Sequence, residues 1–484
     1  MSKDLRFAVI GAGPAGIAAG RELLAQGFSN FRIFEKSDEI GGTWHLNTYP
    51  GLACDVKAHA YTFSYRPNPD WSASFVNQPE IKAYLQTCAS EFGLDPYIEV
   101  NAEIASARYQ GTGEWLLTTR SGEAHTFDVV INAMGNQHTN IFPDVPGIDS
   151  FRGDWWHSMK WNDDVDLTGK RVVVVGSAAA SIQLVPEVAK QAGTLKVLQR
   201  TPNWILPRGA KPYSATSRSL MRTFPFLARG VRAFHEKIMN LSTGATQLGH
   251  KTQERVEDMV RKHIDQAVKD PVLKELVTPK GHFGCKRPLV SDFWYPALQR
   301  DNVELVASAL KEVTPSGVLT QDGRRFDADV IVYATGYKVM DFERIDVVGL
   351  EGATLGETLG RAPEAFKSIA APGFPNYFFT FGPNGATAAA SYFTAIEANI
   401  RAILKVVREK EAAGAKAVQP REDLTSDYND WILQEREKFA WGVAACDSYY
   451  RTASGHTPFL FPGDVKTFMQ QREEVGLHEF EVVA

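Results

Sequence analysis

Residues 7–16 read FAVIGAGPAG, an apolar strand that runs directly into a glycine-rich turn. Gly11, Gly13 and Gly16 open a helix-like stretch, and FRIFEK then reads as the next strand. Glycines at this spacing permit a tight turn and let the backbone approach a pyrophosphate at a helix N-terminus. Glu35 ends the second strand, where an acid can hold ribose hydroxyls. These four residues therefore predict a dinucleotide site, although a plain turn followed by a surface glutamate would look similar.

The same plan recurs further along the chain. Residues 171–176 read RVVVVG, followed by SAAAS, a helix-like IQLVPEVAKQA and a strand-like LKVLQR. Each unit closes on an apolar strand that ends in A-x-G, the first at Gly135 and the second at Gly336. Strand–helix–strand units with fully apolar strands are typical of buried parallel sheets. The repeat predicts an α/β fold with two Rossmann-like dinucleotide-binding domains.

The two units differ at the end of their second strand. Arg200, followed by Thr201, stands at the same offset from Gly176 as Glu35 does from Gly11. An acid there repels a 2′-phosphate, whereas a guanidinium pairs with it. We therefore expect FAD in the first site and NADPH, rather than NADH, in the second. The residues that we expect to bind NADPH are Gly176, Ser177, Ser181, Arg200 and Thr201.

Two observations leave the second site open to another interpretation. Ala178 stands where the second glycine of the pattern belongs, and its methyl group is expected to crowd the pyrophosphate. Arg200 could instead be a solvated charge at a strand end.

The domain boundaries follow from the repeat. We expect an FAD-binding domain from residues 1–140 and 337–484, because no third strand–helix–strand unit follows Gly336. An NADP-binding domain is expected from residues 141–210 and 281–336. Residues 211–280 are helix-like and rich in Arg, Lys and Phe, so they are expected to form a helical insertion in the second domain. Within that insertion LMRTFPFLARGVRAF reads either as a helix packed on the core or as a loose membrane contact.

The composition is that of an ordinary globular enzyme. Of 484 residues 44% are apolar and 23% charged, and the net charge of −5 provides no basic field, so no nucleic-acid partner is expected. No apolar run is long enough for a membrane span, and the N-terminus lacks the features of a secretory signal. The four cysteines show neither a C-x-x-C nor a zinc spacing, so we expect no metal, no redox dithiol and a cytoplasmic location. The protein is expected to be a monomer or a small homo-oligomer.

Three segments give the chain a family resemblance. Residues 151–162 read FRGDWWHSMKWN, and this linker resembles the fingerprint F-x-G-x-x-x-H-x-x-x-W-[P/D] of Baeyer–Villiger monooxygenases, apart from Asn162. Residues 41–55 match the family motif [A/G]-G-x-W-x4-[F/Y]-P-[G/M]-x3-D in full. FGCKRP followed by RDNVELV looks like the family's catalytic-arginine stretch. The resemblance continues through ATGY, FPNYFF and CDSYY, where Tyr449 replaces a tryptophan of many relatives.

The resemblance implies type I, FAD- and NADPH-dependent Baeyer–Villiger chemistry. It implies that a flavin peroxide attacks a hydrophobic ketone in the presence of dioxygen and yields an ester or lactone. Arg287 would hold the peroxide as an anion, because arginine keeps its proton, and Asp55 would orient it. Further cofactor-binding residues implied by the family are Gly42, Thr43, Trp44, Asp55, Tyr61 and Lys286. Residues expected to couple the domains are Phe151, Gly153, His157 and Trp161.

Other interpretations remain open. His157 and Trp161 could simply pack in the linker, Asp55 could be a turn residue, and Arg287 could form a structural ion pair. A flavin-containing N- or S-oxygenase would use a protonated hydroperoxide and would not need Arg287. A flavin-binding NADPH oxidase, reductase or sensor would keep the glycine loops without oxygenation.

Overall fold

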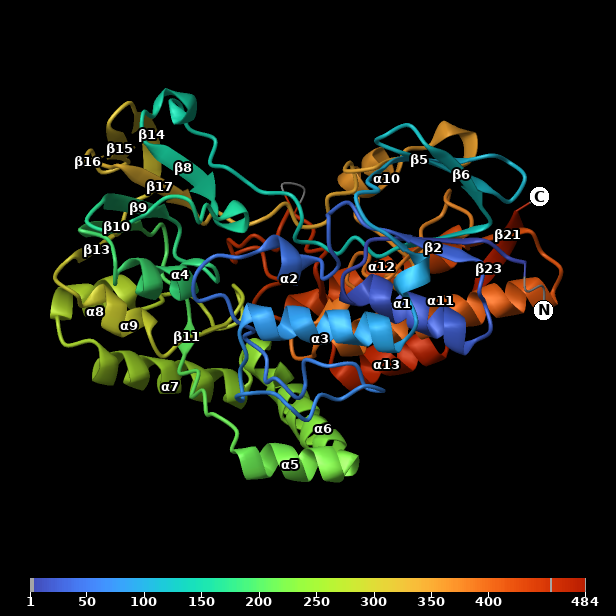
Figure 1. The fold of residues 1–484 in the computed structure, drawn as a ribbon, viewed down its shortest axis with the longest axis horizontal. Helices are drawn as coiled ribbons and strands as arrows, with labels where there is room; N and C mark the ends of the chain where they lie inside the picture. Colours follow the sequence, from blue (N-terminus) through green and yellow to red (C-terminus); the bar gives the residue numbers. More distant parts are fainter. Residues whose placement is uncertain (1–3, 453–454, 484) are drawn as a thin grey trace.

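The computed structural model describes residues 4–452 and 455–483 and shows two lobes, each built on a parallel sheet (Figure 1). The strands of the first sheet, in spatial order, are β19 (Tyr377–Phe379), β7 (Val129–Asn132), β1 (Phe7–Ile10), β2 (Phe31–Phe34) and β3 (Ile98–Glu99). The second sheet consists of β8 (Asp154–His157), β17 (Val330–Tyr333), β9 (Arg171–Val175), β10 (Thr194–Leu198) and β13 (Val303–Val306). All neighbouring strands in both sheets run parallel.

The two sheets have the same strand order when β1 is matched with β9 and β2 with β10. This confirms the α/β fold with two Rossmann-like units. One difference concerns residues 151–162, which the sequence indicated as a linker. Asp154–His157 instead form β8, the edge strand of the second sheet, paired with β17.

Each parallel sheet lies between a helical layer and a smaller sheet of mainly antiparallel strands. Phe7 and Val9 pack in the cluster that includes α1 (Pro14–Ala25), whereas Ala8 and Ile10 pack towards the antiparallel strands, as alternation along a strand requires. The helical layer of the first lobe also includes α3 (Gln78–Glu91) and α11 (Tyr392–Ala412). Its smaller sheet has the order β18 (Asp346–Val348), β4 (Ile104–Tyr109), β5 (Trp115–Thr119) and β6 (Ala124–Phe127), in which β18 runs parallel to β4 and the other neighbours are antiparallel. The second lobe repeats this with α4 (Ser181–Val188), α9 (Trp294–Leu298) and the sheet of β14 (Leu310–Thr314), β15 (Gly317–Thr320) and β16 (Arg325–Asp327).

The region expected to be a helical insertion is helical, and it extends below both lobes in Figure 1. Its helices are α5 (Ala215–Thr223), α6 (Pro225–Leu241), α7 (Lys251–Ala267) and α8 (Pro271–Val277). After the second sheet the chain returns to the first lobe, where β19 joins β7 and α11 packs on α1. The remaining elements of this lobe include α10 (Leu355–Arg361), α12 (Glu422–Glu435), α13 (Val465–Glu473), β21 (Ala417–Pro420) and β23 (Phe480–Val483).

Candidate functional site

The first glycine loop connects β1 to α1 and has little room for side chains. Gly11 has φ +105°, and a Cβ there would lie 2.8 Å from the Ala133 carbonyl oxygen. A Cβ on Gly16 would lie 1.8 Å from the Gly11 carbonyl oxygen. The helix that follows begins at Pro14 without a side-chain cap, so backbone N–H groups at its N-terminus remain available to a phosphate.

Glu35 is buried beside this loop. One carboxylate oxygen accepts from the Ala12 N–H at 2.8 Å and the other from the Ser37 N–H at 2.9 Å. These bonds fix the carboxylate at the end of β2, and its further lone pairs fit the ribose hydroxyls that the sequence indicated.

Gly13 meets a second glycine turn that the sequence did not connect with it. A Cβ on Gly42 would lie 2.9 Å from Gly13 Cα, and the Gly41 N–H donates to the Ala12 carbonyl at 3.1 Å. Gly42 has φ +57° and immediately precedes the short helix α2 (Thr43–Leu46). The close contact explains why both chain segments need glycine at the same point.

The second glycine loop repeats the first at the end of β9. Gly176 has φ +113°, and a Cβ there would lie 2.5 Å from the Ala334 carbonyl oxygen, as Gly11 faces Ala133. Ser181 replaces the third glycine, and its hydroxyl donates to the Gly176 carbonyl at 2.8 Å. Ser177 is buried, whereas Ala178 is exposed. The Ser181 hydroxyl therefore stabilises the loop through its bond to Gly176. The helix α4 begins at Ser181 without a side-chain cap.

Arg200, Thr201 and Lys286 gather at the end of β10. The Lys286 ammonium donates to the Thr201 hydroxyl, while burial and the nearby Arg200 charge lower the pKa of Lys286. The Arg200 side chain is 70% exposed, and its nearest carboxylate is Asp447, at 3.8 Å. Two cations that face one carboxylate leave a positive site, which fits a 2′-phosphate. Asp447, which follows Cys446 in CDSYY, was not singled out from the sequence.

Arg287 and Asp55 form an ion pair between the lobes. Arg287 Nε and Nη2 donate to Asp55 Oδ2 at 3.0 and 2.7 Å. The Asp55 charge raises the pKa of Arg287 against the opposing effect of burial, so the guanidinium stays charged. Tyr449 and Tyr450 lie beside it, with their ring centroids 4.3 Å apart.

A second arginine, Arg208, lies close to this pair and was not found from the sequence. Its Nη2 donates to the Cys54 carbonyl at 3.2 Å, and its buried Nε has no partner in the described part of the chain. Burial lowers the pKa of Arg208.

The motif of residues 41–55 joins the two lobes. Trp44 Nε1 donates to the Tyr61 hydroxyl at 3.1 Å, next to the first glycine loop. Gln183 of α4 accepts from the Tyr49 hydroxyl at 3.1 Å and donates to the Ala53 carbonyl at 2.9 Å. The motif thus runs from the first loop, past the second lobe, to Asp55. Thr43 contributes a carbonyl that accepts from the Asn47 amide at 2.9 Å.

The fingerprint residues pack within the second lobe and beside the chain that returns to the first. His157 is buried, its Nδ1 accepts from the Met159 N–H, and its Nε2 faces the Gly336 carbonyl at 3.1 Å. Burial lowers the pKa of His157 to about 4, so the imidazole is neutral and donates through Nε2. A Cβ on Gly153 would lie 2.7 Å from the Phe151 ring. The Trp161 ring packs against Trp156, with the centroids 5.5 Å apart.

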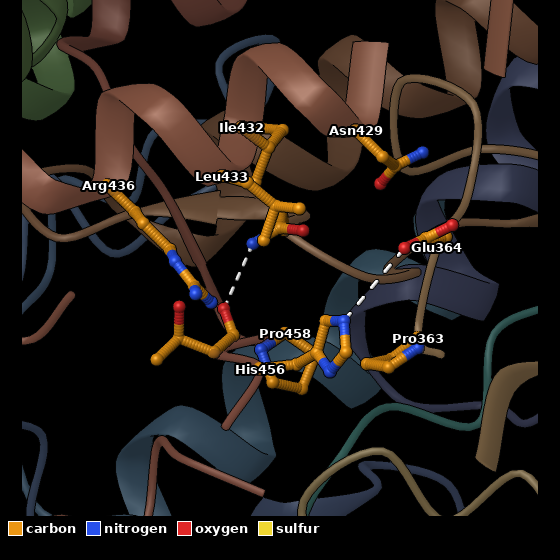
Figure 2. Close-up of a pocket in the computed structure, with 10 residues that line it drawn as sticks. Pro363, Glu364, Asn429, Ile432, Leu433, Arg436, His456 and Pro458 are labelled. Carbon is orange, nitrogen blue, oxygen red and sulfur yellow. Dashed lines mark hydrogen bonds and ion pairs between the residues drawn. The ribbon is translucent and has the colours of Figure 1, made fainter. Parts of the chain in front are cut away.

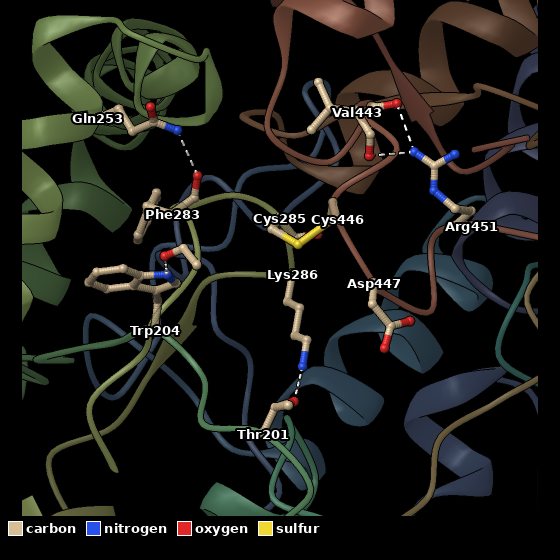
Figure 3. The surroundings of a disulfide bond; sticks show 12 residues. Thr201, Trp204, Gln253, Phe283, Cys285, Lys286, Val443, Cys446, Asp447 and Arg451 are labelled. Atoms are coloured by element: carbon tan, nitrogen blue, oxygen red, sulfur yellow. Dashed lines mark hydrogen bonds between the residues drawn. A yellow bond between two sulfur atoms is a disulfide. The ribbon is translucent and has the colours of Figure 1, made fainter. Parts of the chain in front are cut away.

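The structure corrects the expectation for the cysteines. Cys285 and Cys446 form a disulfide across a sequence separation of 161 residues (Figure 3), and only Cys54 and Cys88 are free. The bond directly precedes Lys286 and Asp447 along its two segments. No local spacing could reveal it, because the two cysteines meet only when the C-terminal segment folds back onto the second lobe.

A small cavity lies outside the set of residues described above. A cavity of about 10 Å³ near His456 and Glu364 (Figure 2) has room for about one water molecule and does not include Arg287. Within residues 4–452 and 455–483 no group of three or more His, Cys, Asp or Glu could hold a metal ion. In the same ranges no helix has the length and apolarity to cross a bilayer.

Comparisons with known proteins agree with this geometry. The model of the flavin-binding monooxygenase-like family matches residues 4–348. A Streptomyces coelicolor protein named Baeyer–Villiger monooxygenase is 36% identical over 99% of this chain and 93% of its own. A Pseudomonas aeruginosa protein of the same name is 34% identical over 96% of this chain and 88% of its own. The crystal structure of OTEMO complexed with FAD and NADP is similar with a TM-score of 0.87, 27% identity and 99% coverage of both chains.

Proposed function

The chain belongs to the flavin-binding monooxygenase-like family, and we propose that it acts as a Baeyer–Villiger monooxygenase that uses FAD and NADPH to convert a ketone into an ester or lactone. The observation that carries the proposal is the Asp55–Arg287 ion pair between the two lobes that carry the glycine loops. Neither an N- or S-oxygenase nor a simple NADPH oxidase needs a permanent cation at that place.

Each loop has its own cofactor under this proposal. Gly11, Gly13, Gly16, Glu35 and the turn at Gly42 would hold FAD, with Trp44 and Tyr61 beside it. The loop at Gly176 and the cluster of Arg200, Thr201 and Lys286 would hold NADPH. When bound, FAD accepts hydride from NADPH and activates dioxygen.

Arg287 would provide a fixed positive charge for the oxygen that reacts with the ketone. Its ion pair with Asp55 holds the guanidinium plane and moderates its field, and its raised pKa keeps the proton at every working pH. A cation held in advance stabilises developing negative charge without reorganisation during the reaction. His157 is neutral and hydrogen-bonded at both ring nitrogens, so we assign it a positioning role between β8 and Gly336.

We propose a hydrophobic ketone as substrate. The side chains near Arg287 include the aromatic rings of Tyr449, Tyr450 and Tyr392, and the last of these stacks on Phe381 at 4.6 Å. Aromatic walls favour an apolar molecule that has a single polar group to meet the arginine.

Exchange of Arg287 tests the proposal. Arg287→Ala should retain FAD and lower ester formation by about 10²–10³, the usual effect of losing one preorganised charge. NADPH oxidation that survives should yield hydrogen peroxide. The measurement is ester formed per NADPH consumed, with cyclic, linear, aromatic and steroidal ketones scored by product mass.

Two matched variants distinguish position from charge. Arg287→Lys keeps a cation but loses the two-nitrogen contact with Asp55. We therefore expect the ester formed per NADPH consumed to lie between the values of the wild type and Arg287→Ala. Arg171→Ala removes an exposed arginine at the far end of β9 and should leave the ester ratio unchanged. A wild-type ester ratio in Arg287→Ala would remove Arg287 from the mechanism. Oxygenation of only amines and sulfides by the wild type would favour the N- or S-oxygenase.

We also propose a cytoplasmic location, because the cytoplasm supplies NADPH. In that compartment the Cys285–Cys446 disulfide would be exposed to thiol reductants.

A further inference from the structure

Helices α5 and α6 carry apolar side chains that face water. They lie at the lower edge of the molecule in Figure 1, away from both parallel sheets. Sixteen large apolar side chains are exposed in the described part of the chain, and seven of them fall within residues 220–241. Six of these form what we call the α5–α6 surface, namely Leu220, Phe224, Phe226, Phe234, Ile238 and Leu241. Scattered exposed apolar residues are normal, but such a concentration marks an interaction site.

The exposed residues of α6 follow the helical period. Phe234, Ile238 and Leu241 recur at spacings of four and three, so they share one face, and they are 59%, 50% and 69% exposed. Ala228, which lies about 120° around the helix from Phe234, is buried. An ordinary surface helix turns its apolar stripe towards the core, whereas α6 presents this one outward.

The surface is also strongly basic. Residues 211–241 contain six Lys or Arg and a single Glu, in a chain whose net charge is −5. Arg222 pairs with Asp70, and Arg232 pairs with Glu236 at 2.9 Å. Arg229 and Lys237 are exposed, and no carboxylate of the described residues lies within ion-pair distance of either.

We propose that the α5–α6 surface docks on the anionic face of a lipid bilayer. The phenylalanine and leucine side chains would enter the boundary between headgroups and acyl chains, and Arg229 and Lys237 would meet the lipid phosphates. The helices would lie in the plane of the interface, consistent with the lack of any spanning helix in the described part of the chain.

Charge disfavours the main competing occupant. A second copy of the chain would bring the same basic face against itself in a two-fold contact, with like charges opposed. A bilayer with anionic headgroups complements both the cations and the apolar stripe.

Vesicle co-sedimentation of the FAD-loaded holoenzyme tests this proposal without measuring activity. The wild type should pellet about tenfold more with phosphatidylserine-containing vesicles than with pure phosphatidylcholine, and added salt should reduce that difference. Phe226→Ser with Phe234→Ser, or Arg229→Glu with Lys237→Glu, should each abolish the preference.

Matched controls are present elsewhere in the chain. Val272→Ser with Val482→Ser removes two side chains that are 66% and 61% exposed, and Lys311→Glu with Arg325→Glu makes the same charge change on β14 and β16. Both controls should pellet like the wild type. The melting temperature of every variant is measured, so that loss of folding is recognised.

The proposal is overturned if the wild type fails to pellet with anionic vesicles, or if control and surface variants lose binding equally. It is also overturned if the wild type is a dimer that Phe226→Ser with Phe234→Ser dissociates while vesicles are not bound, because a second copy would then be the occupant. Failure of ester formation has no bearing on this result.

Discussion

Arg200 lies just after β10, with most of its side chain in water and Asp447 as its nearest carboxylate. Because no part of the fold depends on the Arg200 side chain, Arg200→Ala should leave the melting temperature unchanged. The variant should lose only the contact with the 2′-phosphate. Loss of a hydrogen bond to a charged group costs about 1.5–3 kcal/mol, so the KM for NADPH should rise roughly tenfold to a hundredfold. The KM for NADH, which lacks that phosphate, should stay unchanged. Equal use of both cofactors by the wild type would contradict the assignment.

Lys286 gives the same site a pH dependence. Its ammonium is present below its pKa and lost above it, and burial together with Arg200 lowers that pKa from the ordinary lysine value. The KM for NADPH should therefore begin to rise at a lower alkaline pH than an unperturbed lysine would give. Lys286→Arg should abolish the rise, because a guanidinium keeps its proton.

Arg200→Ala provides the internal control for this titration. This variant removes one of the two causes that lower the pKa of Lys286. The alkaline rise in the KM for NADPH should therefore shift to higher pH, although the KM is larger at every pH. A profile that keeps its position in this variant would show that another group titrates.

At the scale of elements, the contact between Gly13 and Gly42 joins the first glycine loop to α2. Gly42→Ala would add a methyl group 2.9 Å from Gly13 Cα at φ +57°, so the two turns should separate and FAD occupancy should fall. Gly27→Ala is the matched control, since Gly27 has φ +84° but nothing within 4 Å of its Cβ position.

Both variants place an alanine at positive φ and so carry a backbone cost on the order of 1–3 kcal/mol. Only Gly42→Ala should lose flavin absorbance per mole of protein beyond what its melting temperature explains. Equal flavin loss in the two variants would show that backbone strain, and not the contact, is responsible.

Local patterns in the sequence predicted the elements well. Short stretches of sequence, through their periodicity and turn residues, predicted the glycine loops, the offsets of Glu35 and Arg200, and the insertion helices. The Asp55–Arg287 pair came from family resemblance, since 232 residues separate its members.

Contacts between distant segments could not be predicted from local sequence patterns. The meeting of Gly13 with Gly42, the place of Asp447 beside Arg200 and the Cys285–Cys446 bond all depend on how packed units lie against each other. The β8 strand was missed because DWWH does not alternate and borders a helical turn.

At the scale of the whole molecule, the disulfide ties the C-terminal segment to the stretch that carries Lys286 and Arg287. Protein purified without reductant and then denatured should show two titratable thiols, from Cys54 and Cys88, and four after reduction. A disulfide of this kind typically contributes about 2–4 kcal/mol, so Cys446→Ser should lower the melting temperature by several degrees. It should also lower ester yield per NADPH, because Tyr449 and Tyr450 lose their anchor beside Arg287.

Cys88→Ser is the comparison, since Cys88 is buried and free. Its melting temperature should still fall on addition of dithiothreitol, whereas that of Cys446→Ser should not respond. Four thiols in the unreduced wild type would show that the bond does not form.

The place of β19 beside β7 determines the order in which the lobes can be completed on the ribosome. Thr380, which follows β19, donates to the Asn132 carbonyl across 248 residues, and α11 covers the helical face of the same sheet. All strands of the second sheet lie within residues 154–333 and are made before β19. At about 5–20 residues per second, β7 waits on the order of 10–50 s for its edge partner. The first lobe, whose translation begins first, is therefore the last to be completed. We expect stable flavin binding only after the whole chain has been synthesised.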